Sequence, residues 1–149
     1  MKKLLSIILT LAVWLPLHAQ NKPVSWNFSY KKVSAYTYNV FLSATVSEPW
    51  HIYSETTPAG GPVPTKITFS GNPLLKMNGQ INEQGELKVV HDKNFGVDVK
   101  YFKGDVSFVQ TIKVISKAKT SLHGTIEYMV CNDKKCLPPE TIPFDIAIN

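Results

Sequence analysis

The stretch YNVFLSATV, residues 38–46, has an apolar side chain at every second position. A second stretch, residues 106–114, alternates in the same way, with Val106, Phe108, Ile112 and Val114 as its apolar members. Successive side chains of a β-strand point to opposite faces, so a period of two predicts strands that bury one face. No helical period appears after the N-terminal segment, and we therefore expect an all-β protein.

Further strands are predicted at residues 24–30, 50–53, 65–69, 87–90, 97–102, 122–130 and 142–148. Turn signals rich in glycine, proline and asparagine separate them at residues 58–61, 70–73, 94–96 and 103–105. Eight or nine short strands with this spacing are typical of an antiparallel β-sandwich of immunoglobulin-like type. The two cysteines lie in one loop, so they cannot form the inter-sheet disulfide of antibody domains.

The N-terminal segment has the three parts of a secretory signal peptide. Met1-Lys2-Lys3 is basic, residues 4–15 are almost continuously apolar, and a cleavage site follows at Ala19 or Gln20. The alternative is a membrane anchor, but a spanning helix needs about 20 apolar residues and only about a dozen are present. We expect a signal peptide at residues 1–20 and one exported domain at residues 21–149, without stable membrane insertion.

The charge pattern argues against nucleic acid as a partner. The formal net charge of the chain is +5, and it falls to +3 when Lys2 and Lys3 leave with the signal peptide. All 16 basic residues are lysines, so the planar guanidinium groups that bind phosphates and guanine edges are absent. The lysines are scattered along the chain, which indicates a solvated surface.

Both cysteines belong to one polar motif, Cys131-Asn132-Asp133-Lys134-Lys135-Cys136, which is followed by Leu137-Pro138-Pro139-Glu140. If the loop turns, this spacing allows a disulfide. Closing a loop of about six residues contributes only about 2 kcal/mol, so redox exchange is a better use of the pair than a structural staple. A thioredoxin would need C-x-x-C at the start of a helix, whereas strands flank this motif.

The run YMVCNDKKCLPPE, residues 128–140, resembles the N-terminal periplasmic domain of the thiol:disulfide interchange protein DsbD, also called a disulfide-bond corrector domain. The resemblance covers essentially the whole chain after the signal peptide. Residues 50–53 (WHIY) are similar to an aromatic-rich strand near the active site of that family, and residues 91–96 (HDKNFG) to its cap loop. The family fold is an immunoglobulin-like sandwich, which agrees with the period of two.

The resemblance implies a periplasmic relay for thiol:disulfide exchange, an activity of oxidoreductase type. By position in the motif, Cys136 would be the exchanging thiol and Cys131 the resolving thiol. Phe95 would cover the pair as a lid, and Tyr53 and Asp92 would be its neighbours; the alternative for Phe95 and Tyr53 is ordinary core packing.

The resemblance also implies partners. They would be a membrane-embedded thiol electron carrier and periplasmic thioredoxin-like or disulfide isomerase proteins. The chain ends at Asn149 without a membrane domain or a thioredoxin domain, so we expect the electron donor to be a separate protein. We expect no cofactor and no metal. The chain departs from better-known members in its shorter cysteine loop, in Lys93-Asn94 where others have acidic residues, and in the absence of a tyrosine after Phe95.

Two alternatives from other functional classes remain open. The first is a secreted immunoglobulin-like binding module whose disulfide is purely structural. The second is a metal site formed by Cys131 and Cys136 with His51, His91 or His123, although no histidine has the spacing of a zinc finger. Lys134 and Lys135 would favour a thiolate at Cys136 in the redox interpretation; otherwise they are simply solvated.

Overall fold

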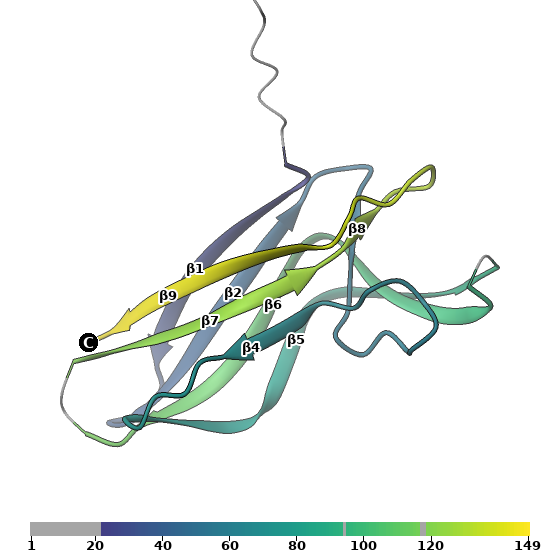
Figure 1. Cartoon of the computed structure of the whole chain (residues 1–149). Helices are drawn as coiled ribbons and strands as arrows, with labels where there is room; N and C mark the ends of the chain where they lie inside the picture. Colours follow the sequence, from purple (N-terminus) through teal and green to yellow (C-terminus); the bar gives the residue numbers. More distant parts are fainter. Residues whose placement is uncertain (1–21, 94, 117–118) are drawn as a thin grey trace, which may run out of the picture.

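The computed structural model describes residues 22–93, 95–116 and 119–149 (Figure 1). The predicted signal peptide lies outside these residues. Within them there is no helix, and the all-β prediction is confirmed. The strands are β1 (Val24–Lys32), β2 (Thr37–Val46), β3 (His51–Tyr53), β4 (Lys66–Phe69), β5 (Leu75–Asp92), β6 (Val97–Val114), β7 (Thr120–Tyr128), β8 (Val130–Cys131) and β9 (Glu140–Ile148).

The strands form two antiparallel sheets that pack as a sandwich. The larger sheet has six strands in the order β1-β2-β6-β3-β8, with β5 also paired to β6, and the smaller has the order β4-β7-β9. Figure 1 shows the smaller sheet in front of the larger one. Along β6, strand β2 pairs with residues 104–113 and β3 with Tyr101 and Phe102. Strand β6 therefore connects the body of the sandwich to the end that carries the cysteines.

The core lies between the two sheets, as the alternation of apolar residues predicts. In β2, every second side chain from Tyr38 to Val46 is buried. The opposite layer contributes Leu122 and Ile126 of β7, which are fully buried, and Phe144 of β9. Burying each such side chain contributes about 1.5–3 kcal/mol, so this core supplies most of the stabilisation of the fold.

The prediction of a turn at residues 103–105 is wrong, because β6 continues through it as one strand. Gly104 has a φ of 75°, and the pairing of β5 with β6 shifts register between Gly85 and Leu87. A glycine with positive φ is characteristic of a β-bulge as well as of a turn, and here it forms a bulge. Strand β5 also begins at Leu75, well before the predicted 87–90, since its first half is an exposed and largely polar edge strand.

The turn predicted at residues 94–96 coincides with the tip of the β5–β6 hairpin, and its first residue, Asn94, lies outside the described residues. Gly96 has a φ of 70°, and its N–H donates to the carbonyl oxygen of Asp92 at 2.7 Å. Figure 1 shows the hairpin tip and the loop after β8 at the same end of the molecule. None of the described residues belongs to a helix long and apolar enough to cross a membrane.

Candidate functional site

The predicted disulfide is present between Cys131 and Cys136, with an S–S distance of 1.97 Å and a Cα–Cα distance of 4.0 Å. The loop that it closes has its own hydrogen bonds. Asn132 N–H donates to the Lys135 carbonyl, and the Asn132 side-chain oxygen accepts from the N–H groups of Lys134 and Lys135, each at 2.9 Å. This Asx turn explains why a polar sequence holds the two cysteines together.

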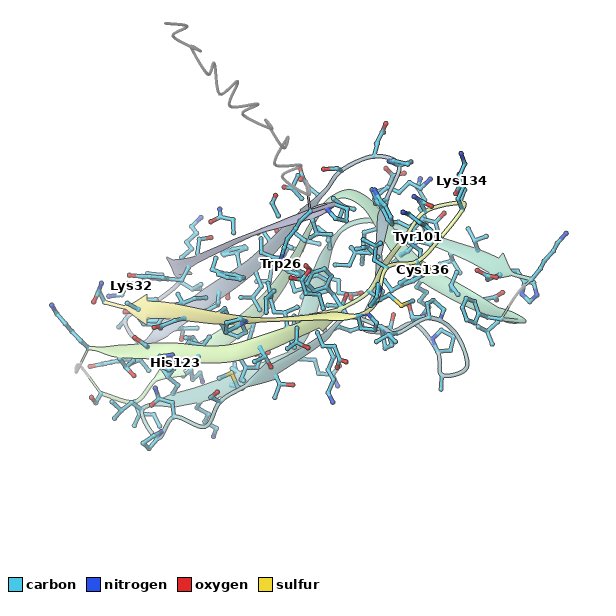
Figure 2. All side chains as sticks on the ribbon, turned by 45° about the horizontal axis from the view of Figure 1, so that its top comes forward. Trp26, Lys32, Tyr101, His123, Lys134 and Cys136 are labelled. Carbon is cyan, nitrogen blue, oxygen red and sulfur yellow. A yellow bond between two sulfur atoms is a disulfide. The ribbon has the colours of Figure 1, made fainter. Side chains whose placement is uncertain are left out.

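The two bonded cysteines differ in exposure. Cys131 is the last residue of β8, only 2% exposed, and packs with Tyr53, Val99 and Met129. Cys136 follows the turn and is exposed to solvent. Figure 2 shows Cys136 near Tyr101 and Lys134, at the end of the sandwich away from Lys32 and His123. Because an attacking thiolate must reach the sulfur, the accessible target is Cys136.

A cleft of about 310 Å³ opens beside the disulfide and brings together the side chains expected at the site. Its lining includes both cysteines and three further predicted residues, namely Tyr53 of β3, Asp92 at the end of β5 and Phe95 at the hairpin tip. These residues come from segments far apart in the sequence. The pairing of β3 with both β6 and β8 brings these segments together.

Phe95 lines this cleft and lies outside the core. Its side chain is 42% exposed, and it does not belong to the clusters of buried residues. Phe95 and Cys136 line the same cleft, as expected for a cap loop. That Phe95 acts as a lid over the pair stays a prediction.

Tyr53 is 3% exposed, and its hydroxyl is hydrogen-bonded to His51. The sequence alone did not identify His51 as a neighbour of the redox pair. The His51 Nε2 and Tyr53 Oη atoms are 3.0 Å apart, and the His51 ring lies 4.4 Å from the Tyr101 ring, centroid to centroid. Burial raises the pKa of Tyr53 to about 12, with a further contribution from Asp92, so its hydroxyl keeps its proton. His51 and Tyr53 are two residues apart in β3, so their side chains lie on the same face of the strand. This spacing is the sequence signal that could have identified His51 as a neighbour of Tyr53.

The other histidines lie elsewhere. His91 Nδ1 is 2.9 Å from an Asp98 carboxylate oxygen on the outer part of the hairpin, and His123 Nδ1 is 3.3 Å from Asp145 between β7 and β9. Both side chains are exposed. Among residues 22–93, 95–116 and 119–149, no three His, Cys, Asp or Glu side chains form a group that could hold a metal ion.

Comparison with known proteins gives one family. A family model described as the N-terminal region of thiol:disulfide interchange protein DsbD matches residues 19–147 of the chain. A search among curated proteins found none that matches.

Three solved structures are similar in fold. The N-terminal periplasmic domain of ScsB from Proteus mirabilis has 14% identity and a TM-score of 0.61; the match covers 86% of this chain but only 47% of that chain. The DsbD N-terminal domain of Neisseria meningitidis in the reduced form has 17% identity and a TM-score of 0.54, with 82% and 85% of the two chains covered. A complex between the DsbD and PilB N-terminal domains of Neisseria meningitidis gives 14% identity and a TM-score of 0.52, covering 91% and 94%. DsbD N-terminal domains have an immunoglobulin-like fold, so the predicted fold class is confirmed.

Proposed function

Because the chain belongs to the family of DsbD N-terminal domains, which carries out thiol:disulfide exchange, we propose that it relays electrons between a thiol donor and oxidised periplasmic proteins. Cys136 exchanges with the partner, and Cys131 resolves the mixed disulfide. The donor is a membrane-embedded or thioredoxin-like thiol carrier, and the acceptors are thioredoxin-like or disulfide isomerase proteins. The signal peptide at residues 1–20 directs the domain to the periplasm.

The unequal exposure of the two cysteines carries this proposal. In the reduced pair, the Cys136 thiolate attacks a disulfide of the acceptor; one acceptor sulfur leaves as a thiolate, and the other is joined to Cys136. Cys131 then attacks the Cys136 sulfur, which restores the internal disulfide and releases the second acceptor thiol. The acceptor gains two electrons and the domain loses two. The first step needs an exposed sulfur, and the second needs a neighbouring sulfur, a role that Cys131 can fill although it is 2% exposed.

Further support comes from the surroundings of the disulfide. Phe95 and the cysteine loop line one cleft, a position from which the ring would restrict access to the sulfur atoms on that side. Apolar cover of this kind protects the pair from small oxidants while leaving a surface that a partner can displace. The similar Neisseria structure contains the PilB N-terminal domain as the partner of a DsbD N-terminal domain, which supports a protein partner here.

Trapping of a mixed disulfide tests the roles of the cysteines. Reduced Cys131→Ala and Cys136→Ala variants are incubated with glutathione disulfide and, separately, with an oxidised thioredoxin, and adducts are followed by intact mass. Cys131→Ala is expected to give a long-lived adduct, because the resolving sulfur is missing. Cys136→Ala is expected to give far less. The assignment of roles is wrong if Cys136→Ala is the variant that accumulates adduct.

Equilibration of the wild-type chain with glutathione buffers separates the relay from a binding module with a structural disulfide. An exchange-competent pair titrates with a potential nearer −200 mV, whereas structural disulfides are generally below about −300 mV. A pair that stays oxidised throughout the glutathione range would favour the structural alternative.

A further inference from the structure

The residue opposite Cys131 in the sheet is His51. Strands β3 and β8 pair in antiparallel register with His51 across from Cys131 and Ile52 across from Val130. Side chains of directly opposed residues stand on the same face of the sheet, with Cβ atoms about 4.5–5.5 Å apart. His51 and Cys131 also line the same cleft. The imidazole is therefore a titratable group on the same face of the sheet as the buried cysteine.

The two ring nitrogens of His51 have different surroundings. Nε2 is bonded to the Tyr53 hydroxyl at 3.0 Å. Nδ1 is buried and has no hydrogen-bond partner among the residues that the structure describes. Since Tyr53 Oη can accept a hydrogen bond, the tautomer with hydrogen on Nε2 leaves the lone pair of Nδ1 free. A buried nitrogen without a partner costs free energy, so its retention calls for an explanation.

Burial, with a further contribution from Lys103, keeps the His51 imidazole neutral. Burial lowers its pKa below the ordinary value of 6.5, and Lys103 of β6 lowers it further. Asp133 of the cysteine loop and Asp92 of β5 act in the opposite direction but are smaller contributions than burial. Tyr101 of β6 contributes an aromatic face at 4.4 Å. At neutral pH the ring is therefore a base rather than a cation.

The buried cysteine needs such a base. After Cys136 has formed a mixed disulfide, Cys131 is a thiol that packs with Tyr53, Val99 and Met129. Apolar surroundings raise the pKa of a thiol above about 8.5, yet the thiolate is the attacking species. A neighbouring base that accepts the thiol proton would therefore speed the attack.

We propose that His51 accepts the proton of the Cys131 thiol through Nδ1 while Cys131 attacks the mixed disulfide on Cys136. The inference rests on the exchange role of the cysteine pair. The electron pair of the S–H bond forms the Cys131–Cys136 bond, and the Cys136–partner bond breaks with its pair on the partner sulfur. The partner thiolate then takes the proton from the imidazolium, so protons and electrons balance. Tyr53 is the positioning residue that holds Nε2.

A two-stage release of thiopyridone separates the two steps. The reduced chain without its signal peptide is mixed at pH 4 with one equivalent of 4,4′-dithiodipyridine, whose reaction with Cys136 releases a first thiopyridone. A rapid jump to a chosen pH then starts the attack of Cys131, which releases a second. The first stage reports on the exchange role of Cys136, and the second on the proton acceptor. Because the second stage is intramolecular, its rate does not depend on protein concentration.

The variants are chosen to separate proton transfer from packing. His51→Phe keeps an aromatic ring against Tyr101 and has no titratable nitrogen, while His51→Gln keeps polarity. His123→Gln is the matched control, because His123 is an exposed histidine at the other end of the sandwich (Figure 2). Tyr53→Phe removes only the hydroxyl that holds Nε2.

In the wild type and in His123→Gln, the second-stage rate is expected to level off above a pH that is lower than 6.5, the ordinary pKa of histidine. In both His51 variants it should rise by a factor of ten per pH unit through pH 8, and at pH 7 it should be slower by about 100-fold or more. Tyr53→Phe should shift the pH of levelling. If both His51 variants keep the wild-type pH profile, the proposal for His51 is overturned while the exchange role stands. If the first stage fails to label Cys136, the proposed function itself fails.

Discussion

Replacing Phe95 by alanine should open access to the disulfide at little cost to stability. The side chain is 42% exposed, so slightly more than half of the ring is buried. Full burial of a phenylalanine contributes about 1.5–3 kcal/mol, and the share at stake here is therefore about 1–2 kcal/mol. A fully buried phenylalanine would cost about 3–5 kcal/mol on truncation, because a cavity remains. The two cases differ by more than the error of a denaturation experiment.

The free energy of the Phe95 contact also limits how much the substitution can raise the reactivity of Cys136. If all of the roughly 1–2 kcal/mol holds the Phe95 ring over the cleft, its loss increases the population of molecules with an uncovered disulfide by about 5- to 30-fold. The alkylation rate of reduced Cys136 by iodoacetamide should rise by up to that factor in Phe95→Ala, and urea unfolding should give the stability loss. Phe102→Ala, where the ring is 1% exposed, serves as the core reference. Val89→Ala, on the same hairpin and 57% exposed, should change neither quantity.

Two results would refute this reasoning about the lid. A stability loss in Phe95→Ala that equals the loss in Phe102→Ala would show that the ring is part of the core. An unchanged alkylation rate, with the expected small stability loss, would show that the ring packs at the cleft without covering Cys136.

Three further predictions concern stability and are tested by urea unfolding. Gly124→Ala should lower the free energy of unfolding by about 3 kcal/mol, because a Cβ there would lie 2.8 Å or less from the Phe144 ring. Gly71→Ala is the control and should be neutral, since a Cβ there would have nothing within 4 Å. Equal losses in the two variants would contradict this prediction. Burial and Glu83 raise the pKa of Glu55 from 4.5 to about 7, so the folded state binds that proton more tightly and stability should fall as pH rises through this window. Glu55→Gln should remove that fall and be more stable at pH 8 by on the order of 1 kcal/mol, allowing for solvent screening; an unchanged pH dependence would argue against it. Reduction of the disulfide should cost no more than about 2 kcal/mol and leave the chain folded; unfolding on reduction would favour a structural bond.

The alternation of apolar residues was sufficient to predict the sandwich where strands are half-buried. Residues 38–46 follow the pattern because one face of β2 packs on the core and the other does not. The pattern failed for the first half of β5, an edge strand with few buried side chains, and at Gly104, where the same residue type serves a bulge as well as a turn. Local sequence signals therefore predicted where strands occur, but not that β5 and β6 are long continuous strands.

For the site, the motif and the family resemblance identified the cysteines, Phe95, Tyr53 and Asp92, all of which line the cleft. His51 was predicted only as part of an aromatic strand or as a metal ligand. Its position opposite Cys131 depends on the pairing of β3 with β8, two short strands far apart in the sequence. Such long-range register is determined by tertiary packing, which the local pattern does not encode.

The hydrogen bonds within the cysteine loop have a consequence for how the domain signals its state. The Asn132 turn and the bond from Leu137 N–H to the Val130 carbonyl, at 2.9 Å, do not involve sulfur. These bonds should therefore persist when the disulfide is reduced. The oxidised and reduced domains would then have nearly the same surface shape. A partner would bind both forms with similar affinity. If the domain exchanges with partners as proposed, a partner distinguishes the two forms only by reacting with the Cys136 sulfur. Complexes with the wrong redox form must then dissociate quickly.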